Sequence, residues 1–254
     1  MDIDGGWVIG LLLAMTRVTG FTIASPMLSK AVPFAGRTAF VVAAGLAFAE
    51  PVGGSVGIWQ LIEMALINTV VGIILGFLTG ILFHLFDIAG NMIDFTSSLA
   101  TAQTLDPMTG SRAGVFGRVF NLTALTIFFA IGGHRLLVKG LQLSIESIPL
   151  NGRLDLDPGL AEVALDAVSL MMVAAVEVAV PAITALFLAE LLLGLASKFA
   201  PQANVFLLGL PAKIVAALAT VSFVVLVFPE AVSGVIEHME ETFSQVIRGM
   251  SGSA

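Results

Sequence analysis

The chain has 254 residues, of which 57% are hydrophobic and 11% charged, and its net charge is −7. A soluble domain carries about 25% charged residues, and one soluble fold of this length cannot hide so much apolar surface, so an ordinary soluble protein is excluded. The acidic balance excludes a nucleic-acid-binding face, and the absence of cysteine excludes disulfides, thiol catalysis and thiolate metal sites.

Six apolar segments follow one another along the chain and predict an all-α protein of membrane type. They cover residues 7–28, 38–49, 61–86, 115–133, 161–197 and 205–228. Crossing a bilayer takes about 20 apolar residues, so we expect the second segment to be too short to cross alone. We expect the first to be a retained anchor, because the acidic N-terminus is unlike that of a cleavable signal peptide.

The third and fifth segments continue into apolar sequence for about two crossings each, as far as residues 102 and 200. We therefore expect these runs to bend, to break or to rise out of the bilayer. The predicted breaks are residues 84–90 in the first run and Pro181 in the second, because an internal proline removes a helix hydrogen bond.

Ionic side chains lie inside the apolar segments, where a charge at the middle of a bilayer costs roughly 2.5–3.5 kcal/mol. Several such residues indicate surfaces that meet protein or water, which favours a subunit of an assembly over a lone bundle in lipid. These residues are Arg17, Glu63, Glu177, Glu190 and Lys213.

Two patterns follow each other in the third run. Gly72, Gly76 and Gly80 lie on one helix ridge and predict close helix packing, with a pore lining as the weaker alternative. Further on, a polar stripe at helical spacing is either a proton or cation path or a face that hydrogen-bonds a neighbour, and the second interpretation is favoured because Gly90 interrupts the stripe. The stripe consists of His84, Asp87, Asn91 and Asp94.

Residues 102–118 read AQTLDPMTGSRAGVFGR and predict a turn followed by a glycine-rich loop. The loop is either a plain connector or a mobile gate, in which its glycines keep it pliable and its methionine offers an adaptable apolar contact. The candidate plug or gating residues are Asp106, Pro107, Met108, Gly110, Arg112, Gly114 and Gly117.

No catalytic signature is found in the sequence, and no metal site or cofactor is predicted. The last residues, 235–254, form an amphipathic tail. Membrane-surface helices are usually basic on their polar face, whereas this tail carries Glu237, Glu240 and Glu241. A basic protein partner is therefore favoured over anionic lipid.

Between residues 191 and 213 two apolar runs flank a polar break, LLLGLASKFAPQANVFLLGLPAK. Freed backbone groups in an apolar setting are costly unless protein groups satisfy them. The break is therefore either a turn at a membrane surface or a hairpin tip buried against a partner. The candidate subunit-contact residues are Lys198, Pro201, Gln202, Asn204, Phe206, Pro211 and Lys213.

This hairpin sequence resembles the PQ-x-N-x-F…G-x-P-x-K pattern of the FliR/SctT family, the export-gate subunits of flagellar and injectisome type III secretion. Further matches, such as Asp106-Pro107 and Gly132-Gly133-His134, extend the resemblance over nearly the whole chain. Family members often have arginine where Lys198 stands, so the bidentate contact that arginine makes is lost here.

The resemblance implies a non-enzymatic subunit of a flagellar export gate in the bacterial inner membrane, partly raised towards the periplasm. It implies FliP-like and FliQ-like partner subunits and unfolded protein substrates, within a helical cone of hairpins. Residues 1–150 would be FliP-like, residues 151–234 a FliQ-like hairpin, and the loop at 106–117 the plug of the pore. The alternative is a secondary transporter or ion channel for a small solute, for which broken helices and a polar stripe are typical.

Overall fold

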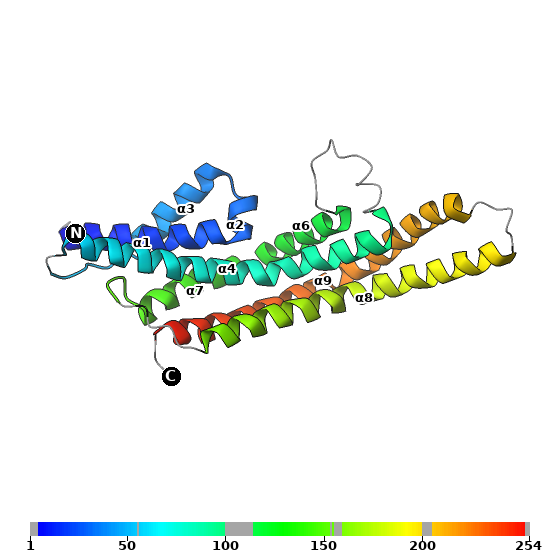
Figure 1. The fold of residues 1–254 in the computed structure, drawn as a ribbon. Helices are drawn as coiled ribbons and strands as arrows, with labels where there is room; N and C mark the ends of the chain where they lie inside the picture. The colour runs from blue at the N-terminus through cyan, green and yellow to red at the C-terminus, as the bar shows by residue number, and fades with distance from the viewer. Residues whose placement is uncertain are drawn as a thin grey trace. The chain divides into compact units, whose positions relative to one another are not determined.

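The structure is a computed structural model that describes residues 5–54, 56–99, 114–152, 154, 159–199 and 205–251. The regular structure of these residues is entirely helical, which confirms the predicted all-α class (Figure 1). In chain order the helices are α1 (Gly5–Ala24), α2 (Pro26–Ala31), α3 (Phe34–Ala47), α4 (Ile58–Thr96), α6 (Val115–Ala130), α7 (His134–Ser147), α8 (Leu160–Phe199) and α9 (Val205–Ser251).

Within the described residues four helices, α1, α4, α8 and α9, are long and apolar enough to cross a membrane. Helices α6 and α7 meet at a bend of 73° and could together form one more broken span. Helix α3 has 14 residues and falls short of a span, as predicted. At 1.5 Å per residue the 39 residues of α4 extend about 58 Å, roughly twice the hydrocarbon thickness of a bilayer.

The predicted breaks in the long runs are wrong. Helix α4 is continuous through residues 84–90, and α8 continues past Pro181. Helix α9 likewise contains Pro211 and Pro229 and runs without interruption into the tail. A proline removes one helix hydrogen bond and bends the axis, but the turns on either side keep their own hydrogen bonds, so in an apolar setting the helix continues.

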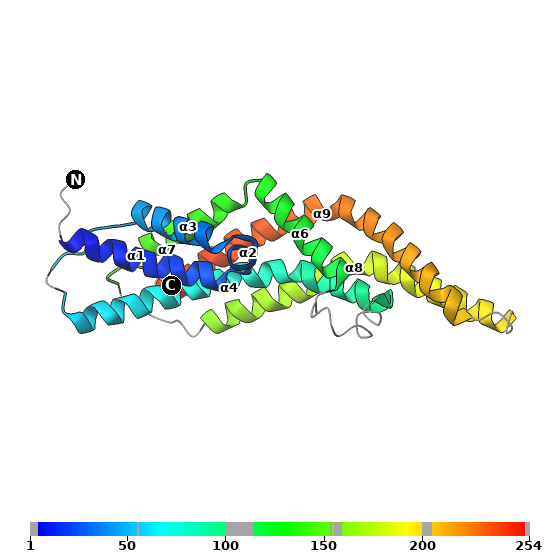
Figure 2. The same ribbon diagram turned by 90° about the horizontal axis from the view of Figure 1, so that it is seen from above.

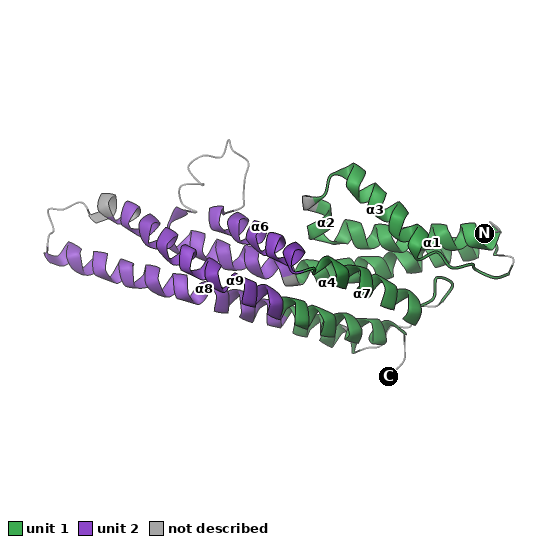
Figure 3. Ribbon diagram, turned by 180° about the vertical axis from the view of Figure 1, so that it is seen from behind, with its two compact units in different colours: residues 1–82, 132–168, 235–254 green, residues 83–131, 169–234 purple. Residues whose placement is uncertain are grey.

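The described helices form two compact units, shown in Figure 3. The first consists of residues 1–82, 132–168 and 235–254, and the second of residues 83–131 and 169–234. Helices α4, α8 and α9 each contribute a part to both units.

In the first unit α1 crosses α4 at the glycine ridge, and the two helices lie side by side in Figure 2. A Cβ atom on Gly72 would lie 2.0 Å from the carbonyl oxygen of Arg17, and one on Gly76 would lie 2.4 Å from that of Phe21. Since such distances are impossible for real side chains, only glycine permits this backbone approach. Helix α3 packs on α1 at Gly45, on the side of α1 that faces away from the glycine ridge.

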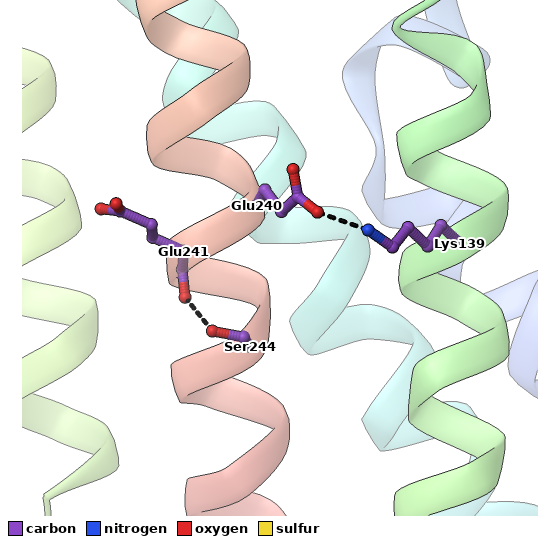
Figure 4. A network of polar contacts seen from close by, with 4 residues as sticks. All are labelled: Lys139, Glu240, Glu241 and Ser244. Carbon is purple, nitrogen blue, oxygen red and sulfur yellow. Dashed lines mark hydrogen bonds and ion pairs between the residues drawn. The ribbon is translucent and has the colours of Figure 1, made fainter.

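The amphipathic tail is the end of α9, and its apolar face is buried within the first unit. Phe243 and Met239 are fully buried, and the ring of Phe243 lies against Gly140 of α7. Lys139 of α7 pairs with Glu240, whereas Glu241 points to the other side of the helix (Figure 4). The chain itself therefore covers the apolar face of the tail, and the acidic face, for which a basic partner is predicted, stays exposed.

Candidate functional site where α4 meets α6

In the second unit the N-terminus of α6 receives its cap from another helix. The N-cap residue is Gly114, which has no side chain to offer the free N–H groups of the first turn. Asp94, in the last turn of α4, takes this role: its Oδ2 accepts hydrogen bonds from the N–H groups of Phe116 at 2.9 Å and Gly117 at 3.1 Å. One turn earlier, Oδ1 of Asn91 accepts from the N–H of Gly114 at 3.2 Å.

We call this arrangement of Asn91 and Asp94 with residues 114–117 the α4–α6 clamp. Asp94 is only 2% exposed, and its carboxylate lies at the positive end of the α6 dipole, which favours a negative charge there. Its second oxygen, Oδ1, is buried and has no hydrogen-bond partner among the described residues. One oxygen therefore carries the connection to α6.

Glycines make the clamp sterically possible. A Cβ atom on Gly90 would lie 2.4 Å from the Cα and N atoms of Gly117, and one on Gly114 would lie 2.0 Å from Oδ2 of Asp94. Gly114 and Gly117 therefore let α4 and α6 approach at backbone distance, and Gly117 lies within α6. For the same reason Gly90 does not interrupt α4; it is the contact point with α6.

The clamp joins the two ends of the predicted gating loop. Asp94 precedes the segment 100–113 and Phe116 follows it, 22 residues later. Of the candidate gating residues, Gly114 and Gly117 lie in the clamp. The other five lie outside the described residues: Asp106, Pro107, Met108, Gly110 and Arg112.

The four residues of the polar stripe divide into two pairs. Asn91 and Asp94 are engaged in the clamp. His84 is exposed and lies 3.9 Å from the half-buried Asp87, between Nδ1 and Oδ2. The stripe is thus on one helix, as its spacing predicts, but only Asn91 and Asp94 take part in the clamp.

The described part of the hairpin between α8 and α9 contains one ion pair. The Nζ of Lys213 lies 3.0 Å from Oε1 of Glu190, so these two in-segment charges neutralise each other. Lys198 and Pro211 are exposed. Pro201, Gln202, Asn204 and the side chain of Phe206 lie outside the described residues.

The first unit holds a second polar cluster that the sequence interpretation missed. We expected Arg17 to meet protein or water, and the protein that it meets is its own chain, in which it is fully buried. Its Nε donates to Oδ1 of Asn68 at 2.9 Å, its Nη1 to the carbonyl oxygen of Ser144 at 2.7 Å, and its Nη2 to that of Ile148 at 2.8 Å. The Nδ2 of Asn68 in turn donates to the carbonyl oxygen of Leu150 at 2.8 Å.

No carboxylate pairs with Arg17 among the described residues. Its charge instead lies at the C-terminus of α7, where the carbonyl oxygens of the last turn and the negative end of the helix dipole favour a cation. Arg17 and Asn68 thereby tie α1 and α4 to the end of α7 and the turn that follows it.

Comparison with known proteins places these features in a family. The family model described as bacterial export proteins, family 1, matches residues 8–239. The flagellar biosynthetic protein FliR of Bacillus subtilis is 30% identical over 189 residues, which cover 74% of this chain and 70% of that protein. The surface presentation of antigens protein SpaR of Shigella sonnei is 29% identical over 175 residues, or 68% and 67% of the two chains. The Yop proteins translocation protein T of Yersinia pestis is 33% identical over 149 residues, or 57% and 56%.

Proposed function

Because the chain belongs to the bacterial export proteins, family 1, we propose that it is a non-enzymatic core subunit of the flagellar type III protein export gate. Its role is in protein export, and the similarity to flagellar proteins supports the flagellar assignment. In this proposal it forms a channel for unfolded export substrates together with FliP-like and FliQ-like subunits, in the inner membrane at the flagellar basal body and partly raised towards the periplasm.

The observation that carries the proposal is the exposure of long apolar helices. In the apolar windows of α8 and α9 only 17% and 22% of the residues are buried within the chain. Exposed apolar area of this extent needs lipid or partner chains to cover it, and both helices are longer than one crossing requires. Partner subunits that cover the helices beyond the bilayer would explain both facts.

Within the assembly we assign a gate role to residues 100–113, the segment whose two ends are joined by the α4–α6 clamp. A closing element needs a fixed base, and Asp94 provides it by holding the start of α6 against α4.

We further propose that residues 1–150 act as the FliP-like part, residues 151–234 as the FliQ-like hairpin and residues 235–254 as a tail. Energy for export would come from partner proteins or the proton gradient.

A transporter for a small solute is the weaker candidate. That alternative depended on broken helices and on one continuous polar stripe. Helices α4 and α8 are continuous, and among the described helices the bend between α6 and α7 is the one broken span that remains. Asn91 and Asp94 are engaged in the clamp, so the polar stripe does not continue as one path.

The dependence of the chain on its partners tests the proposal. We expect the full chain to yield a stable, monodisperse species in detergent only when FliP-like and FliQ-like subunits of the same bacterium are co-expressed, because its exposed apolar helices need them. Size-exclusion chromatography with native mass spectrometry measures this outcome. A monodisperse monomer that moves a solute into liposomes without partners would contradict the proposal and favour the transporter.

A further inference from the structure

An ionisable side chain stands alone in the middle of an exposed apolar face of α8. Glu177 is exposed, and so are its neighbours on the helix surface, Val173, Val176 and Val180. Glu177 makes no hydrogen bond or ion pair with any described residue. An ionisable residue within a candidate span indicates a functional contact, in which another group supplies the opposite charge.

The chain supplies a counter-charge to the other carboxylate in this part of α8 but not to Glu177. Glu190 pairs with Lys213, and Leu193 lies against Gly209, so α8 and α9 run antiparallel in a defined register. Glu177 lies thirteen residues before Glu190, and the residue thirteen positions after Lys213 is Leu226. Leu226 is 75% exposed and cannot neutralise a carboxylate.

Lipid is a poor cover for this face of α8. Glu177 lies among exposed valines, so a bilayer that covered these valines would enclose its carboxylate. A charge at the middle of the hydrocarbon core costs roughly 2.5–3.5 kcal/mol. Asp166 lies eleven residues earlier, which is about three helical turns, so it is on the same side of α8, and it is also exposed.

We propose that this face of α8 docks on an apolar helix of a partner chain that carries a lysine or arginine opposite Glu177. The valines provide the apolar contact, and the charge pair fixes the register between the two helices. The inference rests on the proposed function, because it needs an assembly with partner subunits, and it names the chemistry of one of their contacts.

A spin label tests what covers the face. The chain has no cysteine, so Val173→Cys provides a unique attachment site for a nitroxide. In membranes that contain the complete export apparatus we expect collisions with both oxygen and a water-soluble nickel chelate to be at least threefold rarer than for the labelled chain in detergent without partners. High oxygen access in those membranes would indicate lipid, and high nickel access would indicate water; either result overturns the proposal.

Charge reversal tests the pairing itself. We expect Glu177→Lys to reduce the amount of assembled complex at least tenfold and Glu177→Gln to reduce it less. Glu162→Lys is the matched control, because Glu162 is exposed in the first turn of the same helix and should leave assembly within twofold of the wild type. A lysine or arginine in a co-purifying apolar helix, changed to glutamate, should restore assembly of the Glu177→Lys variant.

The failures of the two proposals are distinguishable. If Glu177→Lys and Glu177→Gln both leave assembly within twofold of the wild type while partners still co-purify, this inference is wrong and the proposed function stands. If the wild-type chain is monomeric whatever is co-expressed, the proposed function fails and the inference fails with it.

Discussion

Replacing Arg17 with methionine is expected to lower the free energy of unfolding by about 3–5 kcal/mol, because buried acceptor oxygens would lose their donor. Methionine fills much of the same space but donates no hydrogen bond. The oxygen atoms of Asn68 and Ile148 would lose their donor in a site without solvent access, whereas the carbonyl oxygen of Ser144 would keep the backbone N–H of Ile148 as a donor. A buried polar group without a partner costs about 1–3 kcal/mol, and two of them are affected.

Thermal unfolding of the purified complex in detergent measures this loss. For a chain of this size each kcal/mol corresponds to about 2–4 °C, so a fall of roughly 6–20 °C is expected. Arg118→Met is the matched control, because Arg118 is exposed on α6 and should leave the transition unchanged. Arg17→Lys should lower the unfolding temperature more than Arg118→Met and less than Arg17→Met, since an ammonium group cannot reproduce the fork of donors of a guanidinium group. A shift no larger for Arg17→Met than for Arg118→Met would show that the cluster does not hold α1, α4 and α7 together.

Replacing Asp94 with alanine is expected to loosen the start of α6. Loss of an N-cap costs about 0.5–2 kcal/mol, and here the buried N–H groups of Phe116 and Gly117 would also remain without an acceptor. Each factor of ten in amide exchange corresponds to 1.4 kcal/mol, so an opening free energy lowered by about 2–3 kcal/mol raises exchange at these amides roughly 30- to 150-fold. Hydrogen exchange followed by mass spectrometry, on peptides that cover residues 114–120, measures this change.

Three variants separate the clamp from general damage to α4. Asp87→Ala lies on the same helix but outside the clamp and should leave exchange at residues 114–120 unchanged. Asn91→Ala removes one longer hydrogen bond at an exposed side chain and should have a smaller effect than Asp94→Ala. Asp94→Asn keeps an acceptor oxygen but loses the charge that the α6 dipole favours, and should be intermediate. Equal exchange in Asp87→Ala and Asp94→Ala would contradict the role of the clamp.

The positions of most helices could be predicted, because apolar runs bounded by proline, glycine and polar clusters are local signals. The continuity of α4, α8 and α9 could not, because rules for breaks derive from helices in water. There a proline or glycine lets the chain turn towards solvent, whereas in an apolar setting a broken helix exposes backbone groups that nothing satisfies. Helix α7 was missed as an apolar segment because Arg135, Lys139 and Glu146 give it a mixed composition.

The two polar clusters show the limit of single-sequence reasoning about contacts. Arg17 was recognised as unusual because it is a charge in an apolar segment, but its acceptors lie 127 and 131 residues further on. Asn68, the single amide within residues 61–86, was the one signal that could have suggested its partner. For the clamp the signal was Gly114, a glycine at a helix start where a capping side chain is expected.

The conductance of the assembled gate tests the central claim most directly. Deleting residues 108–113 removes the middle of the proposed gating loop but keeps Gly114, so the hydrogen bonds of Asp94 and Asn91 to α6 stay in place. In membranes that contain the assembled export apparatus, the deletion is predicted to raise the leak of small ions clearly above that of the wild type. Unchanged conductance in a complex that still assembles would contradict the account that this segment closes an export channel.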